Sequence, residues 1–337
     1  MRKGMEDFME FQKMYTNCEL CPRKCNVNRQ AGKLGVCGVD NQLKLARAAL
    51  HYWEEPCISG TRGSGAVFFS GCSLHCVFCQ NEKIAPGLVG KCVPDERLAE
   101  IFLELQEKGA NNINLVTPGQ YVPHIIQSVE KARNQGLRLP IIYNTSSYEC
   151  VDTIKSLEGI VDVYLPDFKY MDSRLSAKYS HAPDYPKVAK AAIAEMVRQQ
   201  PAAYFYPESV KLEVKQGTSA NLITTDDVWV NEAEDGYLIG KGVIVRQLLL
   251  PGMLADAMAI VKYLYHTYGK QIYISMMSQY TPLEHVEDYP ELNQKVTAEE
   301  YETYVNYAIR IGVAHGFIQE GEVAEESFIP EFNCEGV

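Results

Sequence analysis

The sequence predicts an α/β fold in which parallel strands and intervening helices form a partial (β/α)6 TIM-like barrel, short of the eight units of a complete barrel. Two observations lead to this fold class. Apolar runs rich in β-branched and aromatic residues recur between residues 66 and 276, and stretches of helical periodicity separate them. A cysteine-rich segment precedes the first run, and we expect it to form a small N-terminal metal-binding knuckle.

Six apolar runs are expected to be the barrel strands. They are Ala66–Ser70, Asn112–Val116, Pro140–Asn144, Val161–Leu165, Val243–Leu250 and Ile272–Met276. Helices are expected between them, as where Leu98, Ile101, Phe102 and Leu105 follow the spacing i, i+3, i+4 and i+7. A last helix should begin at Thr297, because Thr297 and Glu300 form the pattern of a capping box.

The chain divides into three expected parts: an N-terminal extension over residues 1–60, the barrel over 61–320, and a C-terminal tail over 321–337. The connection from Asp167 to Lys241 is much longer than the others and includes an insertion near 201–237. Because long connections often form lids, and this one leaves the carboxyl end of a strand, we favour a lid over the active site. Packing of the insertion on the outside of the barrel is the alternative.

Composition limits the class of protein. The 43 acidic residues exceed the 32 basic ones, for a net charge of −11, which disfavours broad nucleic-acid binding. The apolar stretch over 243–264 is interrupted by charged residues and a proline, so no membrane span is expected. The N-terminus lacks the apolar core of a secretion signal. Because neither a membrane span nor a secretion signal is expected, the eleven cysteines point to metal ligands rather than disulfides. We expect a cytoplasmic protein of an organism that tolerates or requires low oxygen.

The most informative segment is the cysteine loop Cys72-x3-Cys76-x2-Cys79, which directly follows the first predicted strand. Three closely spaced thiolates can hold three irons of a [4Fe-4S] cluster, whereas four cysteines normally fill it. The fourth iron would be open to a ligand that is not protein, so the cluster could take part in chemistry. Part of a zinc site is the main alternative.

A second set of cysteines, Cys18, Cys21, Cys25 and Cys37, lies within twenty residues near the N-terminus. Zinc in a four-thiolate site and an auxiliary iron–sulfur cluster both fit this spacing, and unliganded thiols remain the alternative. The other cysteines have no partner spacing and are expected to be ordinary reduced thiols.

Polar residues also gather where the predicted strands end. Thr117–Gln120 follows the second strand, Asn144–Ser147 ends the third, Asp167 and Lys169 follow the fourth, and Arg246 lies within the fifth. The carboxyl ends of barrel strands usually form the active site. We interpret the glycine-rich segment Gly60–Gly65 as a turn, because it precedes a strand whereas a phosphate-binding loop would follow one.

The chain resembles the radical S-adenosylmethionine (SAM) superfamily, and within it the pyruvate formate-lyase-activating-enzyme-like group with an N-terminal four-cysteine motif. The resemblance covers residues 15–320. The segments that carry it are Cys18–Cys25, Val27–Arg29, Gly60–Gly65, Phe68–Cys72, Cys79–Asn81, Asn112–Pro118, Val161–Tyr170, Pro251–Gly252 and Ser278–Tyr280.

The resemblance implies roles for individual residues. Cys72, Cys76 and Cys79 would ligate a [4Fe-4S] cluster whose open iron binds SAM. The residues implied to bind SAM are Phe78 beside the adenine, Gly119 through its backbone, Asn144 and Ser146 near the ribose and carboxylate, and Asp167, Lys169 and Arg246 close to SAM. Asp167 would also help to hold a monovalent cation. Catalytic side chains are not indicated.

The sequence therefore predicts a radical SAM enzyme that cleaves SAM to a 5′-deoxyadenosyl radical and abstracts hydrogen from a small molecule, for example a heterocycle, in lyase-type chemistry. The alternative is an oxidoreductase that activates a glycyl-radical enzyme. A non-catalytic iron–sulfur electron-transfer protein is a weaker alternative. A flavodoxin- or ferredoxin-type protein is the expected electron donor.

Overall fold

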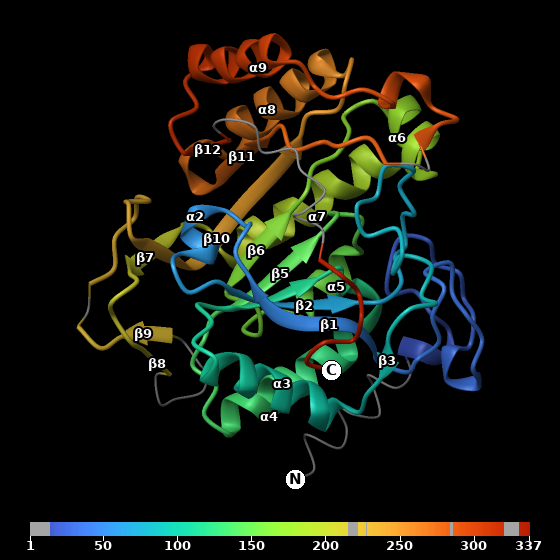
Figure 1. The fold of residues 1–337 in the computed structure, drawn as a ribbon, viewed down its shortest axis with the longest axis vertical. Helices are drawn as coiled ribbons and strands as arrows, with labels where there is room; N and C mark the ends of the chain where they lie inside the picture. The colour runs from blue at the N-terminus through green and yellow to red at the C-terminus, as the bar shows by residue number, and fades with distance from the viewer. Residues whose placement is uncertain (1–13, 215–221, 227, 284–285, 320–329) are drawn as a thin grey trace.

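The structure, a computed structural model, describes residues 14–214, 222–226, 228–283, 286–319 and 330–337. One large sheet dominates it, with the strand order β12-β11-β10-β6-β5-β4-β2-β1-β3 (Figure 1). The strands on this path are β1 (Lys44–His51), β2 (Ser64–Phe69), β3 (Lys91–Cys92), β4 (Ile113–Val116), β5 (Ile141–Thr145), β6 (Val163–Pro166), β10 (Tyr237–Leu248), β11 (Tyr273–Met277) and β12 (Gly316–Ile318).

The six predicted strands are confirmed as a continuous parallel array. They correspond to β2, β4, β5, β6, β10 and β11, and each pairs in parallel with the next. The predicted fold class, a partial TIM-like barrel, is therefore correct. Three outer strands of this path were not predicted: β12 extends the parallel array, β1 pairs antiparallel with β2, and β3 pairs antiparallel with β1.

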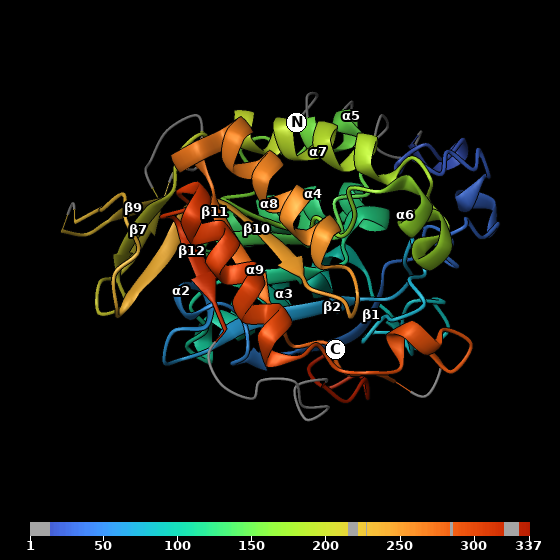
Figure 2. The ribbon, with the colours of Figure 1, turned by 90° about the horizontal axis from the view of Figure 1, so that it is seen from above.

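Helices cover the outside of the curved sheet, as Figure 2 shows from above. They pack in neighbouring pairs, α3 beside α4, α5 beside α7 and α8 beside α9. Their bounds are α2 (Pro56–Ser59), α3 (Asp95–Glu107), α4 (Val122–Asn134), α5 (Val151–Lys155), α6 (Ser173–Ser180), α7 (Tyr185–Gln199), α8 (Leu254–Tyr268) and α9 (Ala298–Ile311). The predicted capping box is confirmed: Thr297 accepts from the Glu300 backbone, and the Glu300 carboxylate accepts from the Thr297 backbone.

The last described residues, 330–337, lie along β1. The backbone N–H of Ala48 donates to the carbonyl of Glu335 at 2.8 Å, and that of Cys334 donates to Ala46 at 3.0 Å. The ring of Phe332 meets the ring of Phe68 edge-on, with 5.4 Å between centroids. This segment therefore covers the antiparallel side of the barrel.

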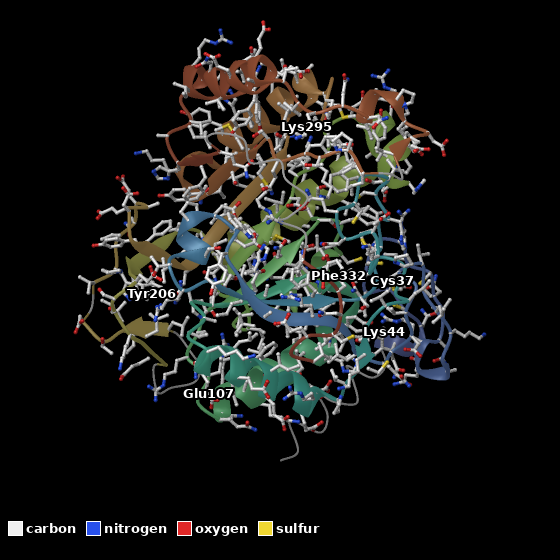
Figure 3. All side chains as sticks on the ribbon, in the orientation of Figure 1. Cys37, Lys44, Glu107, Tyr206, Lys295 and Phe332 are labelled. Carbon is white, nitrogen blue, oxygen red and sulfur yellow. The ribbon has the colours of Figure 1, made fainter. Side chains whose placement is uncertain are left out.

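The expectation that the insertion near 201–237 forms a lid is wrong for the part of it that the structure describes. Strand β7 (Tyr204–Pro207) pairs antiparallel with residues 237–241, the amino-terminal part of β10. The small hairpin of β8 (Leu212–Val214) and β9 (Leu222–Thr224) follows it. Figure 3 shows Tyr206 of this insertion on the opposite side of the molecule from Cys37. Residues 215–221 and 227 lie outside the described residues.

The reason for this placement is the chain path. Helices α6 and α7 follow β6 and return the chain to the amino-terminal end of the sheet before the insertion begins. There Glu208 accepts hydrogen bonds from the backbone N–H of Thr61 at 3.0 Å and from the Asn111 side chain at 3.0 Å. The insertion thus braces the turn over Gly60–Gly65, which the sequence had identified as a turn.

Among the described residues, no helix combines the length and the apolar character needed to cross a lipid bilayer.

Candidate metal and cofactor site

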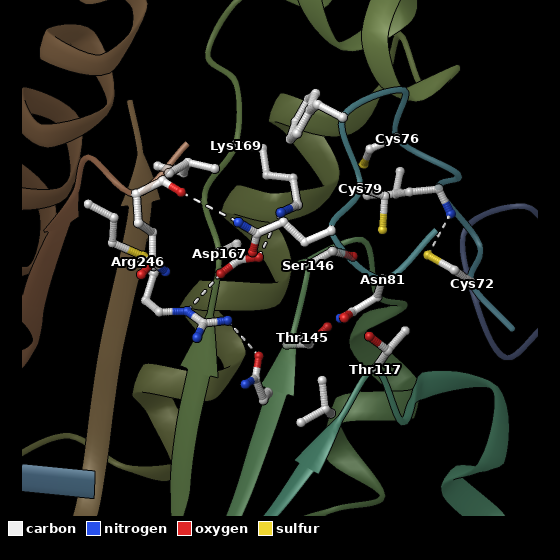
Figure 4. A pocket seen from close by; sticks show the side chains of 18 of the residues that line it. Cys72, Cys76, Cys79, Asn81, Thr117, Thr145, Ser146, Asp167, Lys169 and Arg246 are labelled. Carbon is white, nitrogen blue, oxygen red and sulfur yellow. Dashed lines mark hydrogen bonds and ion pairs between the residues drawn. The ribbon is translucent and has the colours of Figure 1, made fainter. Parts of the chain in front are cut away.

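The three-cysteine loop begins where β2 ends. Gly71, directly before it, has a φ of +92°, and a Cβ there would lie 2.7 Å from the carbonyl oxygen of Cys37. Glycine is therefore the residue that lets the chain leave β2 in this direction. Cys72, Cys76 and Cys79 all line one cavity of about 230 Å³ at the carboxyl ends of the strands (Figure 4).

The sulfur atoms of this loop receive hydrogen bonds. The backbone N–H of Leu74 faces Cys72 Sγ at 3.4 Å, and the hydroxyl of Ser180 donates to Cys76 Sγ at 2.9 Å. Burial raises the pKa of Cys76 to about 11 and raises that of Cys79 as well. The thiolate forms therefore need a positive partner, which iron would supply. Three sulfurs on one wall of a cavity, two with donors, fit a [4Fe-4S] cluster with one open iron.

A network of charged groups forms the facing wall of the cavity. Arg246 Nε donates to Asp167 Oδ1 at 2.8 Å, and Lys169 Nζ donates to Asp167 Oδ2 at 2.7 Å. Arg246 also donates to Asn144 Oδ1 at 2.6 Å and pairs with Glu54 Oε2 at 3.1 Å. Figure 4 shows this group on the ends of the strands, facing the cysteines.

The network fixes the charges of its members. Burial acts to raise the pKa of Asp167, but the neighbouring Arg246 and Lys169 outweigh burial and hold that pKa below its ordinary value. Burial likewise acts to lower the pKa of Lys169, and Asp167 reverses this, so the pKa of Lys169 is raised. All three groups are therefore charged at neutral pH. Arg246 and Lys169 each donate to one oxygen of Asp167. The monovalent cation expected at Asp167 would therefore have to compete with these two side chains.

Most of the residues expected to bind SAM line this cavity, namely Phe78, Asn144, Ser146, Asp167, Lys169 and Arg246. Gly119 differs from the expectation. It does not line the cavity, and a Cβ there would lie 2.7 Å from Glu149 Oε1, beside the N-terminal cysteines. Thr117 of the same connection lines the cavity instead, with a φ of +57°.

Sequence reasoning missed one side of the cavity. His51, Trp53 and Glu54 come from β1 and the segment that follows it, and Phe68 comes from β2. Trp53 is 57% exposed. Pro330 from the C-terminal segment completes this side. These residues were missed because β1 was not predicted, and the end of β1 is what places them at the cavity.

The N-terminal cysteines gather in a smaller cavity. Cys18, Cys21, Cys25 and Cys37 line it together with Cys72 of the loop. A Cβ on Gly35 would lie 3.3 Å from the sulfurs of both Cys25 and Cys37, so those two sulfurs are at most 6.6 Å apart. The structure thus brings together all four cysteines of the motif, beside the three-cysteine loop.

Within the described part of the chain, no three histidine, cysteine, aspartate or glutamate side chains are arranged so that they could hold a single metal ion.

Glu149 and Arg29 are buried charged residues of the smaller cavity that the sequence did not single out. Thr145 donates to Glu149 Oε1 at 2.6 Å, and burial raises the pKa of Glu149 to about 7. Arg29 donates to the Gln120 carbonyl at 2.9 Å and approaches Cys18 Sγ at 3.8 Å. Neither residue could be recognised from sequence spacing, because the residues around them come from distant parts of the chain.

Comparison with known proteins agrees with this geometry. Residues 59–181 match the family model of a 4Fe-4S single cluster domain. The matched range contains Cys72, Cys76 and Cys79 and excludes the four N-terminal cysteines. The match therefore identifies the segment that contains the three-cysteine loop as similar to a single-cluster iron–sulfur domain.

Individual relatives are distant. The chain is 24% identical over 303 residues to an uncharacterized protein, MJ0674, of Methanocaldococcus jannaschii, and the aligned region covers 88% of this chain and 75% of that protein. Two solved structures are also similar. SuiB of Streptococcus suis, bound to S-adenosylmethionine, shares 14% identity over 74% of this chain and 48% of its own, with a TM-score of 0.45. A domain of pyruvate-formate lyase-activating enzyme from Bacteroides vulgatus shares 12% over 59% of this chain and 93% of its own, with a TM-score of 0.36. This chain thus spans about half the length of SuiB.

Proposed function

We propose that this enzyme cleaves SAM at the three-cysteine loop and uses the resulting radical to abstract hydrogen from a small molecule. The supporting observation is one cavity in which three cysteine side chains face a fixed group of charges, with aromatic rings on a third side. The cluster and SAM, when bound, supply a 5′-deoxyadenosyl radical. The protein orients the reactants and excludes water.

In this proposal Cys72, Cys76 and Cys79 hold the cluster. Asn144 and Ser146 would orient SAM through hydrogen bonds, and Phe78 would lie beside its adenine. Asp167 would face the cationic sulfonium side, because its charge is maintained by the ion pairs described above. Arg246 and Lys169 would hold Asp167 in place and offer N–H groups to the SAM carboxylate.

The aromatic side of the cavity supports a flat substrate. His51, Phe68 and the half-exposed Trp53 offer faces and edges for stacking. The C-terminal segment closes this side through Phe332 on Phe68 and leaves less room for a polypeptide. Reaction of an enclosed heterocycle, in a lyase-type conversion, is the reaction class we favour.

Activation of a glycyl-radical enzyme is the second candidate function. The observation that favours it is the position of the insertion: in its described part it lies away from the cavity, so it does not restrict entry of a partner's loop. In either case a flavodoxin- or ferredoxin-type protein would supply the electron.

The first test is cleavage itself. The anaerobically reconstituted protein, given dithionite and SAM, should release methionine and 5′-deoxyadenosine. Cys76→Ala should abolish both products, whereas Cys57→Ala, which removes a buried thiol outside both sets, should not. Cleavage that survives Cys76→Ala would contradict the assignment.

The second test separates the two substrate classes. Extract from cells grown in D₂O is divided into a protein-free small-molecule fraction and a macromolecular fraction, and each is added to the reaction. Hydrogen abstraction would place deuterium on 5′-deoxyadenosine. A mass shift with the small-molecule fraction supports our proposal; a shift confined to the macromolecular fraction, with a glycyl radical seen by EPR, would contradict it in favour of activation.

A further inference from the structure

Glu55 lies where the charged network meets the apolar interior of the barrel. Its neighbour Glu54 lines the cavity and pairs with Arg246 at 3.1 Å. Helix α2 follows directly and places Cys57 and Ile58 in an apolar cluster with side chains of β5, β6, β10 and β11. The chain therefore passes from the cavity wall into the apolar interior at Glu55.

Strand β11 shows the same depth from the other side. The Ser275 hydroxyl on this strand lies beside the carboxyl group of Glu55. Side chains alternate along a strand, so Ser275 faces the barrel interior together with Tyr273 and Met277. Tyr273 belongs to the apolar cluster, whereas Met277 lines the cavity. The carboxyl group of Glu55 thus lies directly below the cavity.

This carboxyl group lacks the partners that a buried charge needs. Glu55 is only 8% exposed, and its Oε2 atom is buried without a hydrogen-bond partner among the described residues. Burial raises the pKa of Glu55 and Glu54 adds to the effect, while Arg246 opposes it without outweighing burial. From α2 the Cys57 thiol also faces Glu55, and burial raises the pKa of that thiol. Because an unpaired buried carboxylate is costly, Glu55 keeps its proton to a higher pH than an exposed glutamate does.

The charged side chains that line the cavity balance one another, apart from the cysteines. The cations are Arg246 and Lys169 and the carboxylates are Asp167 and Glu54, joined by ion pairs of 2.7–3.1 Å. His51 also lines the cavity, but burial lowers its pKa, so it adds no charge at neutral pH. A cation that enters therefore meets no unpaired carboxylate among the described lining residues. Glu55 is the carboxyl that would supply a further negative charge, because a nearby cation favours its ionised form.

We propose that Glu55 loses its proton when SAM enters the cavity, and that the resulting carboxylate makes the site prefer the cationic sulfonium of SAM to a neutral thioether. The inference deepens the proposed function and rests on it, because the entering cation is SAM. The O–H bond of Glu55 breaks, its electron pair stays on the carboxylate, and the proton passes to the solvent. No oxidant or reductant takes part.

The test uses the anaerobically reconstituted protein without a reductant, so that SAM binds and is not cleaved. Calorimetric titrations in buffers of different ionisation enthalpy, between about pH 5.5 and pH 8, give the number of protons released on binding. Protons that SAM itself releases are the same in the unchanged protein and in Glu55→Gln, so the difference between the two proteins measures Glu55. We expect a difference of up to about one proton at the acid end, which disappears at about pH 8.

Glu107→Gln is the matched control, because it makes the same change at an exposed position at the end of α3. It should release as many protons as the unchanged protein. Glutamine has the shape of the protonated glutamic acid that the free protein is inferred to contain, so Glu55→Gln should fold.

S-adenosylhomocysteine separates the charge of the ligand from its shape, because it lacks the methyl group and the positive charge on sulfur. At about pH 8, Glu55→Gln should bind SAM about tenfold more weakly than the unchanged protein and S-adenosylhomocysteine with unchanged affinity. Infrared difference spectra at the acid end test the proposal without a variant. A protonated-carboxyl band of the unchanged protein should disappear with SAM and persist with S-adenosylhomocysteine.

Equal proton release by the unchanged protein and Glu55→Gln over the whole range would overturn the inference. An equal loss of affinity for both ligands would also overturn it, since this would indicate a structural role. If these differences are absent but SAM is cleaved once dithionite is added, the inference fails and the proposed function stands. If the differences are present but dithionite yields no 5′-deoxyadenosine, Glu55 has the inferred role and the proposed function fails.

Discussion

Replacing Asp167 by asparagine removes one charge from the centre of the ion network without changing the size of the side chain. Arg246 keeps its contacts to Glu54 at 3.1 Å and to Asn144 at 2.6 Å. Lys169 loses the only carboxylate within ion-pairing distance of it among the described residues. Breaking a buried pair in this way costs about 3–5 kcal/mol.

The structure places the expected cost at the lower end of that range. The Asp167 side chain is 22% exposed, so water compensates part of the loss, and Arg246 retains its second carboxylate. We therefore expect the free energy of unfolding in urea to fall by about 3 kcal/mol. SAM cleavage should fall as well, because Lys169 and Arg246 are no longer held.

The pH dependence has a definite sign. The pKa of Asp167 in the folded protein lies below its ordinary value, so this group stabilises the fold above the ordinary carboxyl pKa of about 3.9. The contribution is lost as pH falls through the lower folded pKa. The difference in unfolding free energy between the unchanged protein and Asp167→Asn should therefore be constant near neutral pH and shrink below about pH 4.

Asp172→Asn is the matched control. Asp172 pairs with the exposed Arg174 and caps α6, and asparagine is an equally good cap. Its unfolding free energy should be nearly unchanged. An Asp167→Asn protein as stable as the Asp172→Asn protein would refute the reasoning that the network is a buried, charged unit.

Three further predictions concern the scaffold, each measured by urea unfolding. Thr297→Ala should cost about 1 kcal/mol because it removes the cap of α9, whereas Thr297→Ser should not; equal stability of the two variants would contradict the capping role. Gly71→Ala should cost about 1–3 kcal/mol, because the φ of Gly71 is +92° and a Cβ would press on the Cys37 carbonyl. The same variant should bind less iron, and an unchanged iron content would contradict the coupling of this turn to the loop. Phe332→Ala should cost about 1 kcal/mol through its lost edge-on contact with β2, and accelerated proteolysis of the C-terminal segment should accompany it; unchanged proteolysis would show that the ring does not hold the segment.

The six barrel strands could be predicted because each is a short apolar run that is buried on both faces. Strand β1 (Lys44–His51) could not, since its sequence Lys-Leu-Ala-Arg-Ala-Ala-Leu-His is rich in alanine and basic residues, which do not favour strands. Its pairing with β2 is a tertiary effect. Missing β1 also meant missing Trp53 and Glu54, because their place in the cavity follows from where β1 ends.

The insertion shows a different limit. The sequence predicts helices between the strands, and the helix of a βα unit returns the chain to the amino-terminal end of the sheet, as α7 does here. An insertion after that helix therefore belongs at the end opposite the active site, which is where the structure has β7. The prediction of a lid considered only that the connection starts at the carboxyl end of the fourth strand. It did not include the helix that returns the chain to the amino-terminal end.

The junction between the two cysteine sets could not be predicted from spacing. Each set follows a recognisable pattern by itself, but the hydrogen bond between Cys72 and Cys37 joins residues 35 positions apart through the turn at Gly71. Glu149 and Arg29 were missed for the same reason, since burial gives them their importance.

The central claim is that SAM binds to the cluster of the three-cysteine loop. The most direct measurement is the EPR spectrum of the Cys21→Ser/Cys25→Ser protein, reduced and recorded with and without SAM, since only the loop cluster then contributes. We expect SAM to change the g-values of that signal, and Cys76→Ala in the same background to remove the signal. A signal that is identical with and without SAM would contradict it.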